Sequence, residues 1–190
     1  MEGGLERVTT LSRSRDFTLS FTAGVGYNDA WYPGDPEVFH AWKPVGSARA
    51  ILELSTSWSL QGGYVRDFAL LQDVTDQVYT TDTVSVTAGG LVAPRTDLRL
   101  GASYSNWTTL LAPGVADRMD IYGASLEVRV ALTGAVKAFA GYYYYQHRYS
   151  NPTALPAGYP AEYNWNAVRV GISLWAPLVG TPGQPPLNQR

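Results

Sequence analysis

Most of this chain alternates between apolar and small polar residues with a period of two. Successive side chains of a β-strand point to opposite faces, so the pattern predicts strands with one apolar and one polar face. Helical periodicity is nearly absent, and we therefore predict an all-β fold. The alternating segments lie at residues 16–27, 47–58, 62–71, 81–92, 98–107, 120–132, 135–149 and 163–175. The segment at 62–71 alternates poorly, because Arg66 and Asp67 are adjacent and must face opposite ways.

The predicted strands are long for a soluble sheet. They run for about 10 to 15 residues, whereas soluble strands have about 5 to 6 and a tilted strand crosses a bilayer in about 9 to 11. Longer connections, at 29–45, 73–77, 111–117 and 150–162, alternate with shorter ones near 58–61, 93–97 and 133–134. Outer-membrane barrels alternate in this way between outer loops and periplasmic turns. We therefore predict an antiparallel up-and-down transmembrane β-barrel of about eight strands, or part of a larger or shared barrel.

Aromatic residues of the apolar face fall near the ends of the predicted strands. Tyr and Trp gather in this way at both interfaces of a membrane protein, although Tyr is also common in soluble antiparallel sheets. We interpret seven residues as an aromatic girdle: Tyr27, Tyr104, Tyr122, Tyr142 and Tyr144 toward the long loops, and Phe17 and Trp58 toward the short turns.

The opposite face distinguishes a membrane barrel from a soluble one. It holds Ser, Thr and Gly with seven charged residues: Arg49, Glu53, Arg99, Glu127, Arg129, Lys137 and Arg169. A water-facing exterior is typically ~25–35% charged, so we expect this face to line a lumen and the apolar face to contact lipid. Five of the seven are positive, which would favour anions if a passage opened. The alternative is a soluble lipocalin-like carrier with an apolar interior.

Composition excludes several classes of function. The net charge is −2, so no basic field would gather nucleic acid. There is no Cys, and His40 and His147 are the two histidines, so neither a metal site nor a cofactor is expected. No apolar run approaches the roughly 18 residues of a membrane helix. The mean hydropathy of −0.13 is compatible with a membrane barrel, whose apolar residues occupy alternate positions.

The chain divides into three segments in this interpretation. Residues 1–14 form an N-terminal periplasmic segment without the apolar core of a secretory signal peptide, 15–178 form the barrel, and 179–190 form a Pro- and Gly-rich periplasmic tail. The expected location is the outer membrane of a Gram-negative cell envelope. Outer-membrane lipid and lipopolysaccharide are the expected partners, together with protein partners in an envelope complex or a homo-oligomer.

One constellation suggests catalysis. His147, Ser150 and Asn151 form an HxxSN sequence, which is similar to the HxSN signature of outer-membrane lipid A deacylases. The resemblance implies His147 as a base and Ser150 as a nucleophile. The spacing departs from the family pattern, because in a strand it turns Ser150 to the face opposite His147. Our prediction is therefore a protein without enzymatic activity, with a lipid-acyl hydrolase as the alternative.

The segments TDLRLGASYSNW, ASLEVRVALTGAVKAFAGYYYYQHRYS and YNWNAVRVGISLW resemble the C-terminal strands of outer-membrane β-barrel porin-like proteins. Some of these are encoded with exopolysaccharide export systems. The resemblance is one of pattern and covers roughly residues 80–178. Such barrels commonly finish on an aromatic residue, whereas fifteen residues follow Trp175 here. The resemblance implies a structural barrel or narrow porin-like channel, as the membrane element of a larger envelope assembly.

Overall fold

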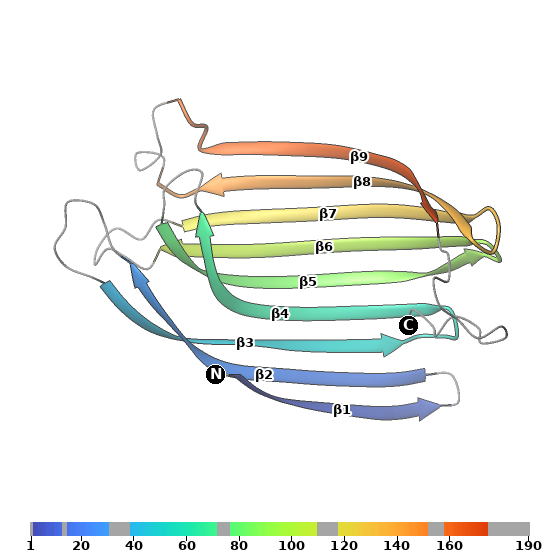
Figure 1. The fold of residues 1–190 in the computed structure, drawn as a ribbon, viewed down its shortest axis with the longest axis horizontal. Coiled ribbons are helices and arrows are strands. Elements are labelled where there is room, and N and C mark those ends of the chain that lie inside the picture. Colours follow the sequence, from blue (N-terminus) through green and yellow to red (C-terminus); the bar gives the residue numbers. More distant parts are fainter. Residues whose placement is uncertain are drawn as a thin grey trace.

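The computed structural model describes residues 2–12, 15–30, 39–71, 77–109, 118–151 and 158–174. These residues form a single antiparallel sheet, in which every strand pairs with its neighbours in the chain (Figure 1). The strands are β1 (Glu2–Ser12), β2 (Arg15–Ala30), β3 (Phe39–Glu53), β4 (Trp58–Leu71), β5 (Gln77–Ala93), β6 (Thr96–Thr109), β7 (Arg118–Ala131), β8 (Val136–Tyr149) and β9 (Glu162–Leu174). The prediction of an all-β, antiparallel up-and-down fold is confirmed.

Two parts of the fold prediction need correction. The described residues form nine strands rather than eight, because β1 pairs with β2 from Glu2 opposite Gly24 to Ser12 opposite Arg15. The sheet is also open rather than closed into a barrel, with β1 at one edge and β9 at the other (Figure 1). The N-terminal segment predicted at 1–14 therefore contains a strand. Residues 175–190, with the predicted tail, lie outside the described residues.

The predicted segment at 47–58 covers parts of two strands. β3 ends at Glu53, and Trp58 is the first residue of β4. Between them, the Ser55 hydroxyl oxygen accepts hydrogen bonds from the backbone N–H groups of Ser57 (3.3 Å) and Trp58 (3.2 Å). Serine commonly stabilises turns in this way, since its short side chain reaches its own backbone. The short connection therefore lies at 54–57 rather than near 58–61.

β4 bends away from β3 at the place where its alternation fails. The β3–β4 ladder ends at Gly46 opposite Arg66, whereas β4 stays paired with β5 as far as Leu71 opposite Gln77. Phe68 then lies against Gly26 of β2, where an added Cβ would be only 2.2 Å from its ring. Gly26 therefore makes room for the Phe68 ring, although β4 does not pair with β2.

The apolar face is the more exposed one. Val168, Val170 and Ile172 on β9 are 73%, 76% and 65% exposed. Among the described residues the buried apolar side chains are Val45, Tyr79 and Met119. Tyr79 and Met119 lie near the long-loop ends of β5 and β7, and Val45 lies in the middle of β3. The apolar residues of the central rows are therefore not gathered into a buried core. No helix of the described residues has the length and apolar character to span a membrane.

Candidate functional site

The strand register places residues in rows, each row being the set of residues that face one another across neighbouring strands. One such row on the apolar face runs from Phe21 on β2 to Tyr122 on β7. Another runs from Phe17 on β2 to Leu126 on β7. Residues of one row lie side by side and point to the same face of the sheet. The rows therefore show which side chains are neighbours on each face.

The apolar residues form an oblique band across these rows. On β2 the apolar positions run from Phe17 to Tyr27, and on β7 with its flanking turn they run from Tyr122 to Leu132. Tyr27 lies six residues nearer the long-loop end than Phe21, which shares a row with Tyr122. Between β2 and β7, which are five strand spacings apart, both ends of the band are therefore displaced by six residues relative to the rows. This is a stagger of about 1.2 residues per strand.

Most of the predicted girdle residues lie at the edges of this band. Tyr27 and Tyr104 are at its long-loop edge, and Phe17 and Trp58 are at its short-turn edge. Tyr104 and Tyr122 are neighbours in one row, with ring centroids 5.2 Å apart, and Tyr27 packs on Trp42 at 4.6 Å. If the band is continued to β8 with the same stagger, Tyr144 also lies at the long-loop edge. Tyr142 then lies one position inside the band.

Charged side chains begin directly beyond Tyr104 and Tyr122, on the long-loop side of the apolar band. The Asp120 carboxylate accepts hydrogen bonds from Tyr104 Oη (2.7 Å), Asn106 Nδ2 (2.8 Å) and Arg118 Nη2 (3.1 Å). Burial alone would raise the pKa of Asp120, but these hydrogen bonds outweigh it and hold the pKa below its ordinary value. Two further ion pairs join Arg66 with Asp82 and Arg148 with Glu162.

The polar face changes character along the strands, and its long-loop end is aromatic. His147 stacks on Tyr163 with ring centroids 4.5 Å apart, and Tyr145 packs on Trp165 at 5.5 Å. Nearby, Tyr79 packs on Trp107 at 5.9 Å. The part of the sheet that was expected to be small and polar therefore carries an aromatic cluster at this end.

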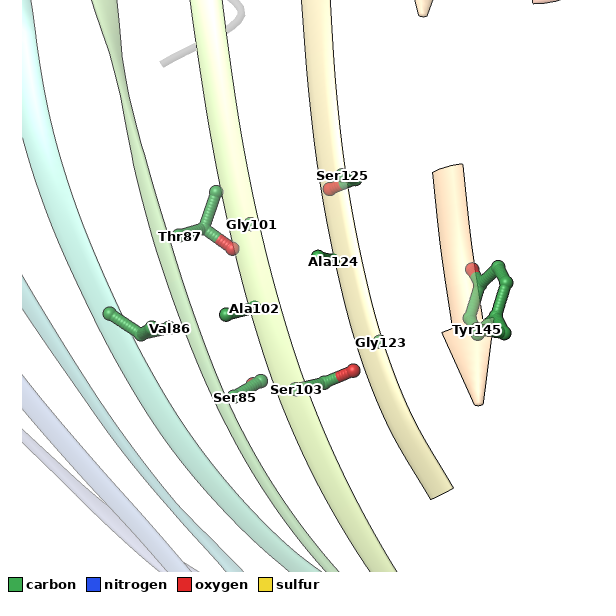
Figure 2. Close-up of a pocket in the computed structure, with 10 residues that line it drawn as sticks. All are labelled: Ser85, Val86, Thr87, Gly101, Ala102, Ser103, Gly123, Ala124, Ser125 and Tyr145. Atoms are coloured by element: carbon green, nitrogen blue, oxygen red, sulfur yellow. The ribbon is translucent and has the colours of Figure 1, made fainter. Parts of the chain in front are cut away.

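The middle of the polar face is lined by hydroxyl groups and glycines. It contains a hollow of about 180 Å³, and Figure 2 shows the residues around it on β5, β6, β7 and β8. Gly101 and Gly123 keep it open, since a Cβ at either position would lie 2.6 Å from a serine hydroxyl. The lining residues of the polar face are Ser85, Thr87, Gly101, Ser103, Gly123, Ser125 and Tyr145.

Next to this hollow, toward the short turns, lies a row that holds three of the predicted lumen charges. Arg99 faces Glu127 across β6 and β7, and Gly141 separates Glu127 from Arg169 on β9. Glu127 accepts hydrogen bonds from Tyr143 Oη (2.9 Å) and from Arg129 Nε. Arg169 lies over the Tyr143 ring, with Cζ 5.2 Å from its centroid. These residues form what we call the arginine cluster: Arg99, Arg129 and Arg169 around Glu127 and Tyr143.

The other predicted lumen charges share this face but lie apart from the arginine cluster. Arg49 donates a hydrogen bond from Nη2 to Gln61 Oε1 (2.9 Å). Glu53 faces Ser59, and Lys137 faces Ser173. All seven predicted charges therefore lie on one face of the sheet, although the structure groups only four of them.

The structure does not bring His147 and Ser150 into a hydrogen bond. The Ser150 hydroxyl donates to the Arg118 backbone carbonyl (3.0 Å) and accepts from the Arg118 N–H (3.1 Å), so it fastens the end of β8 to β7. Nδ1 of His147 is buried without a hydrogen-bond partner in the described part of the chain. The acyl-hydrolase alternative therefore lacks the hydrogen bond between base and nucleophile, His147 and Ser150, that it would need.

Sequence reasoning missed Tyr143 and the glycines of the polar face as site residues. Tyr143 was recognisable only as one tyrosine in a run of four, since its link to Glu127 and Arg169 depends on the register of three strands. The described residues contain no group of three or more His, Asp or Glu side chains that could hold a metal ion. Comparison with protein-family models, with curated proteins and with solved structures found no match for this chain.

Proposed function

We propose that the chain forms wall strands of a transmembrane β-barrel in a bacterial outer membrane, and acts without catalysis as a structural barrel or narrow porin-like channel. The polar face would line the lumen, and the apolar face would contact lipid. The barrel would be the membrane element of a larger envelope assembly. The observation that carries this proposal is the oblique apolar band on the exposed face of the sheet.

The dimensions of the band support a bilayer crossing. Tyr122 and Leu132 are ten residues apart, which is about 33 Å along a strand. With strands about 4.8 Å apart, a stagger of about 1.2 residues per strand corresponds to a tilt of about 40°. The band would then measure about 25 Å along the membrane normal, which is the height of the apolar band of outer-membrane barrels.

The distribution of exposed residues also favours a barrel wall over a soluble carrier. In a lipocalin-like carrier, the apolar face would be the buried interior. Here Leu126, in the middle of the band, is 42% exposed, and Leu132 at its edge is 51% exposed. A sheet that presents such residues along its whole length needs an apolar medium on that side.

A pair of matched substitutions tests the membrane proposal. Leu126→Arg places a charge at the middle of the band, and Leu132→Arg places the same charge at its edge. In a bilayer an arginine costs about 2–4 kcal/mol at the midplane and about 0–1 near the interface. We therefore expect Leu126→Arg to reduce the free energy of folding into phosphatidylcholine vesicles by the larger amount, and Leu132→Arg by much less.

The two variants have an informative alternative outcome. Since both leucines are about half exposed, a soluble sheet would tolerate both substitutions about equally. Equal and small effects, together with a protein that stays monodisperse without detergent, would contradict the membrane proposal. A wild-type protein that migrates differently on a gel before and after heating in detergent would support it.

A further inference from the structure

The arginine cluster lies at the middle depth of the apolar band, but on the opposite face. Glu127 is midway along β7 between Tyr122 and Leu132, which mark the two edges of the band. Charged side chains at this depth are costly, and they commonly mark the path of a solute or ion. The cluster therefore differs from the ion pairs at or beyond the long-loop edge of the band, which are near the membrane surface under the proposed function.

The charges of the cluster do not cancel. Arg129 is paired with Glu127, and Arg99 Nε lies 3.7 Å from Asp97 Oδ2. Arg169 has no carboxylate within 4.0 Å among the described residues. With the neighbouring Asp97 carboxylate counted, three guanidinium groups face two carboxylates, which leaves one net positive charge. Arg169 is the cation without a carboxylate partner among the described residues.

Arg169 is held in place without being neutralised. Its guanidinium lies over the Tyr143 ring, and the hydroxyl of that ring is fixed by its hydrogen bond to Glu127. Gly141 permits this arrangement, because a Cβ there would lie 3.0 Å from the Tyr143 ring. The aromatic face supports the cation while the N–H groups of the guanidinium stay available to an acceptor.

The neighbouring hollow supplies a second kind of contact. Its hydroxyl groups belong to Ser85, Thr87, Ser103 and Ser125 (Figure 2). They make no side-chain hydrogen bonds to other described residues. Ser125 is two residues from Glu127 on β7, so the hollow and the arginine cluster are adjacent on one face. Hydroxyls that both donate and accept are suited to the hydroxyl groups of a ligand.

We propose that Arg169, assisted by Arg99 and Arg129, binds the oxyanion of a hydroxyl-bearing organic anion, and that the hollow binds the hydroxyl groups of the same molecule. Arginine matches carboxylate and phosphate groups through its planar fork of donors. Glu127 and Tyr143 are positioning residues in this site. The inference rests on the proposed function, since only a lumen would give the site a place on a solute path.

The test is equilibrium binding to the full chain purified in a zwitterionic detergent at low salt. The probes are sodium gluconate and glucose 6-phosphate, which separate a carboxylate from a phosphate preference, with acetate and glucose for comparison. We expect gluconate or glucose 6-phosphate to bind more tightly than acetate and glucose. Arg169→Gln should weaken this binding about tenfold or more, and Arg169→Lys should weaken it less.

Two further variants separate the parts of the site. Arg118→Gln removes a positive charge from the other face, so binding should stay within about twofold of wild type. Ser125→Ala should weaken the binding of the hydroxyl-bearing anion but not of acetate. Unchanged binding by Arg169→Gln, or an equal loss in Arg118→Gln, would overturn the site. If acetate binds as tightly as gluconate and glucose 6-phosphate, the hollow does not bind the hydroxyl groups of the anion.

Folding into phosphatidylcholine vesicles is measured in parallel. A protein that folds into vesicles but does not bind either anion overturns the site and leaves the proposed function standing. A protein that binds gluconate but is monodisperse without detergent overturns the proposed function and leaves the binding site standing.

Discussion

Asp120 shows how a single side chain organises the region beyond the apolar band. Its carboxylate joins β7 to β6 through Tyr104 and Asn106, and it also accepts a hydrogen bond from Arg118 on its own strand. Hydrogen bonds that involve a charged group are stronger than those between neutral groups, and a partly buried carboxylate depends on them. Asp120 therefore fixes the orientation of Tyr104, one of the predicted girdle residues, from outside the band.

Asp120→Asn should destabilise the protein at neutral pH by on the order of 1 kcal/mol, because the carboxylate loses its charge. A carboxyl whose pKa is lowered in the folded state contributes stability above its unfolded pKa, about 3.9, and loses it as the pH falls through the folded value. The difference between wild type and variant should therefore be full at pH 7 and shrink below about pH 4. Urea unfolding in detergent, followed by tryptophan fluorescence, measures it.

Glu53→Gln is the matched control. The Glu53 carboxylate makes no hydrogen bond or ion pair with the described residues, so this substitution should leave the unfolding midpoint nearly unchanged. If the difference between wild type and Asp120→Asn is the same at pH 3 as at pH 7, ionisation of Asp120 does not stabilise the fold.

At the scale of residues, sequence predicted the face of each charge but not its partners. Alternation alone puts Arg99, Glu127 and Arg169 on the polar side of their strands. Their common row depends on the registers of β6, β7, β8 and β9, which are set by turn geometry and packing. The sequence pattern therefore could not predict the interaction of Tyr143 with Arg169.

At the scale of elements, the β4–β5 hairpin shows why some strand glycines are costly to replace. Trp58 lies against Gly90, the residue that faces it on β5, and its Nε1 donates a hydrogen bond to the Leu91 carbonyl (2.9 Å). A Cβ at Gly90 would lie 2.4 Å from the Ser57 backbone oxygen and 2.5 Å from Trp58 Cγ. The close approach of these two strands therefore requires a residue without a side chain.

Gly90→Ala should destabilise the folded protein by about 1–3 kcal/mol, because a backbone carbonyl and an indole must both move. Gly62→Ala is the control, since a Cβ at Gly62, on the same face of β4, meets nothing within 4 Å. Thermal unfolding in detergent and the emission wavelength of the tryptophans measure both variants. Equal melting temperatures for the two variants would show that the contact between Trp58 and Gly90 is not tight.

The elements that sequence predicted and those it missed differ in their periodicity. The segment at 120–132 alternates cleanly and coincides with β7 to within two residues at its start. In β1, by contrast, Leu5 faces Phe21 while Val8 faces Thr18, so its apolar residues lie on opposite faces. A spacing of three cannot mark one face of a strand, and pairing with β2 rather than alternation defines β1.

For the whole molecule, the odd number of strands formed by the described residues has a geometric consequence. Since all neighbouring strands are antiparallel, β1 and β9 run in the same direction (Figure 1). Direct closure of β1 on β9 would therefore create one parallel pair. Antiparallel closure under the proposed function requires an odd number of additional strands, because lipid does not tolerate the unpaired backbone groups of an open edge.

Hydrogen exchange tests whether the edges are covered in a membrane. The alternate amides of β9 that do not pair with β8 should be as protected in phosphatidylcholine vesicles as the amides of β6, which has neighbours on both sides. The same β9 amides should exchange rapidly if the edge is open. Rapid exchange in vesicles that hold the folded protein would contradict closure of the sheet at this edge.

The short ladder between β3 and β4 sets the mechanical weak point of the sheet. Only Gly46–Glu53 of β3 is paired with β4, whereas neighbouring ladders extend almost the full length of their strands. Under a lateral pull this seam has the fewest hydrogen bonds to break. The sheet should therefore rupture there first, separating a piece of three strands from a piece of six.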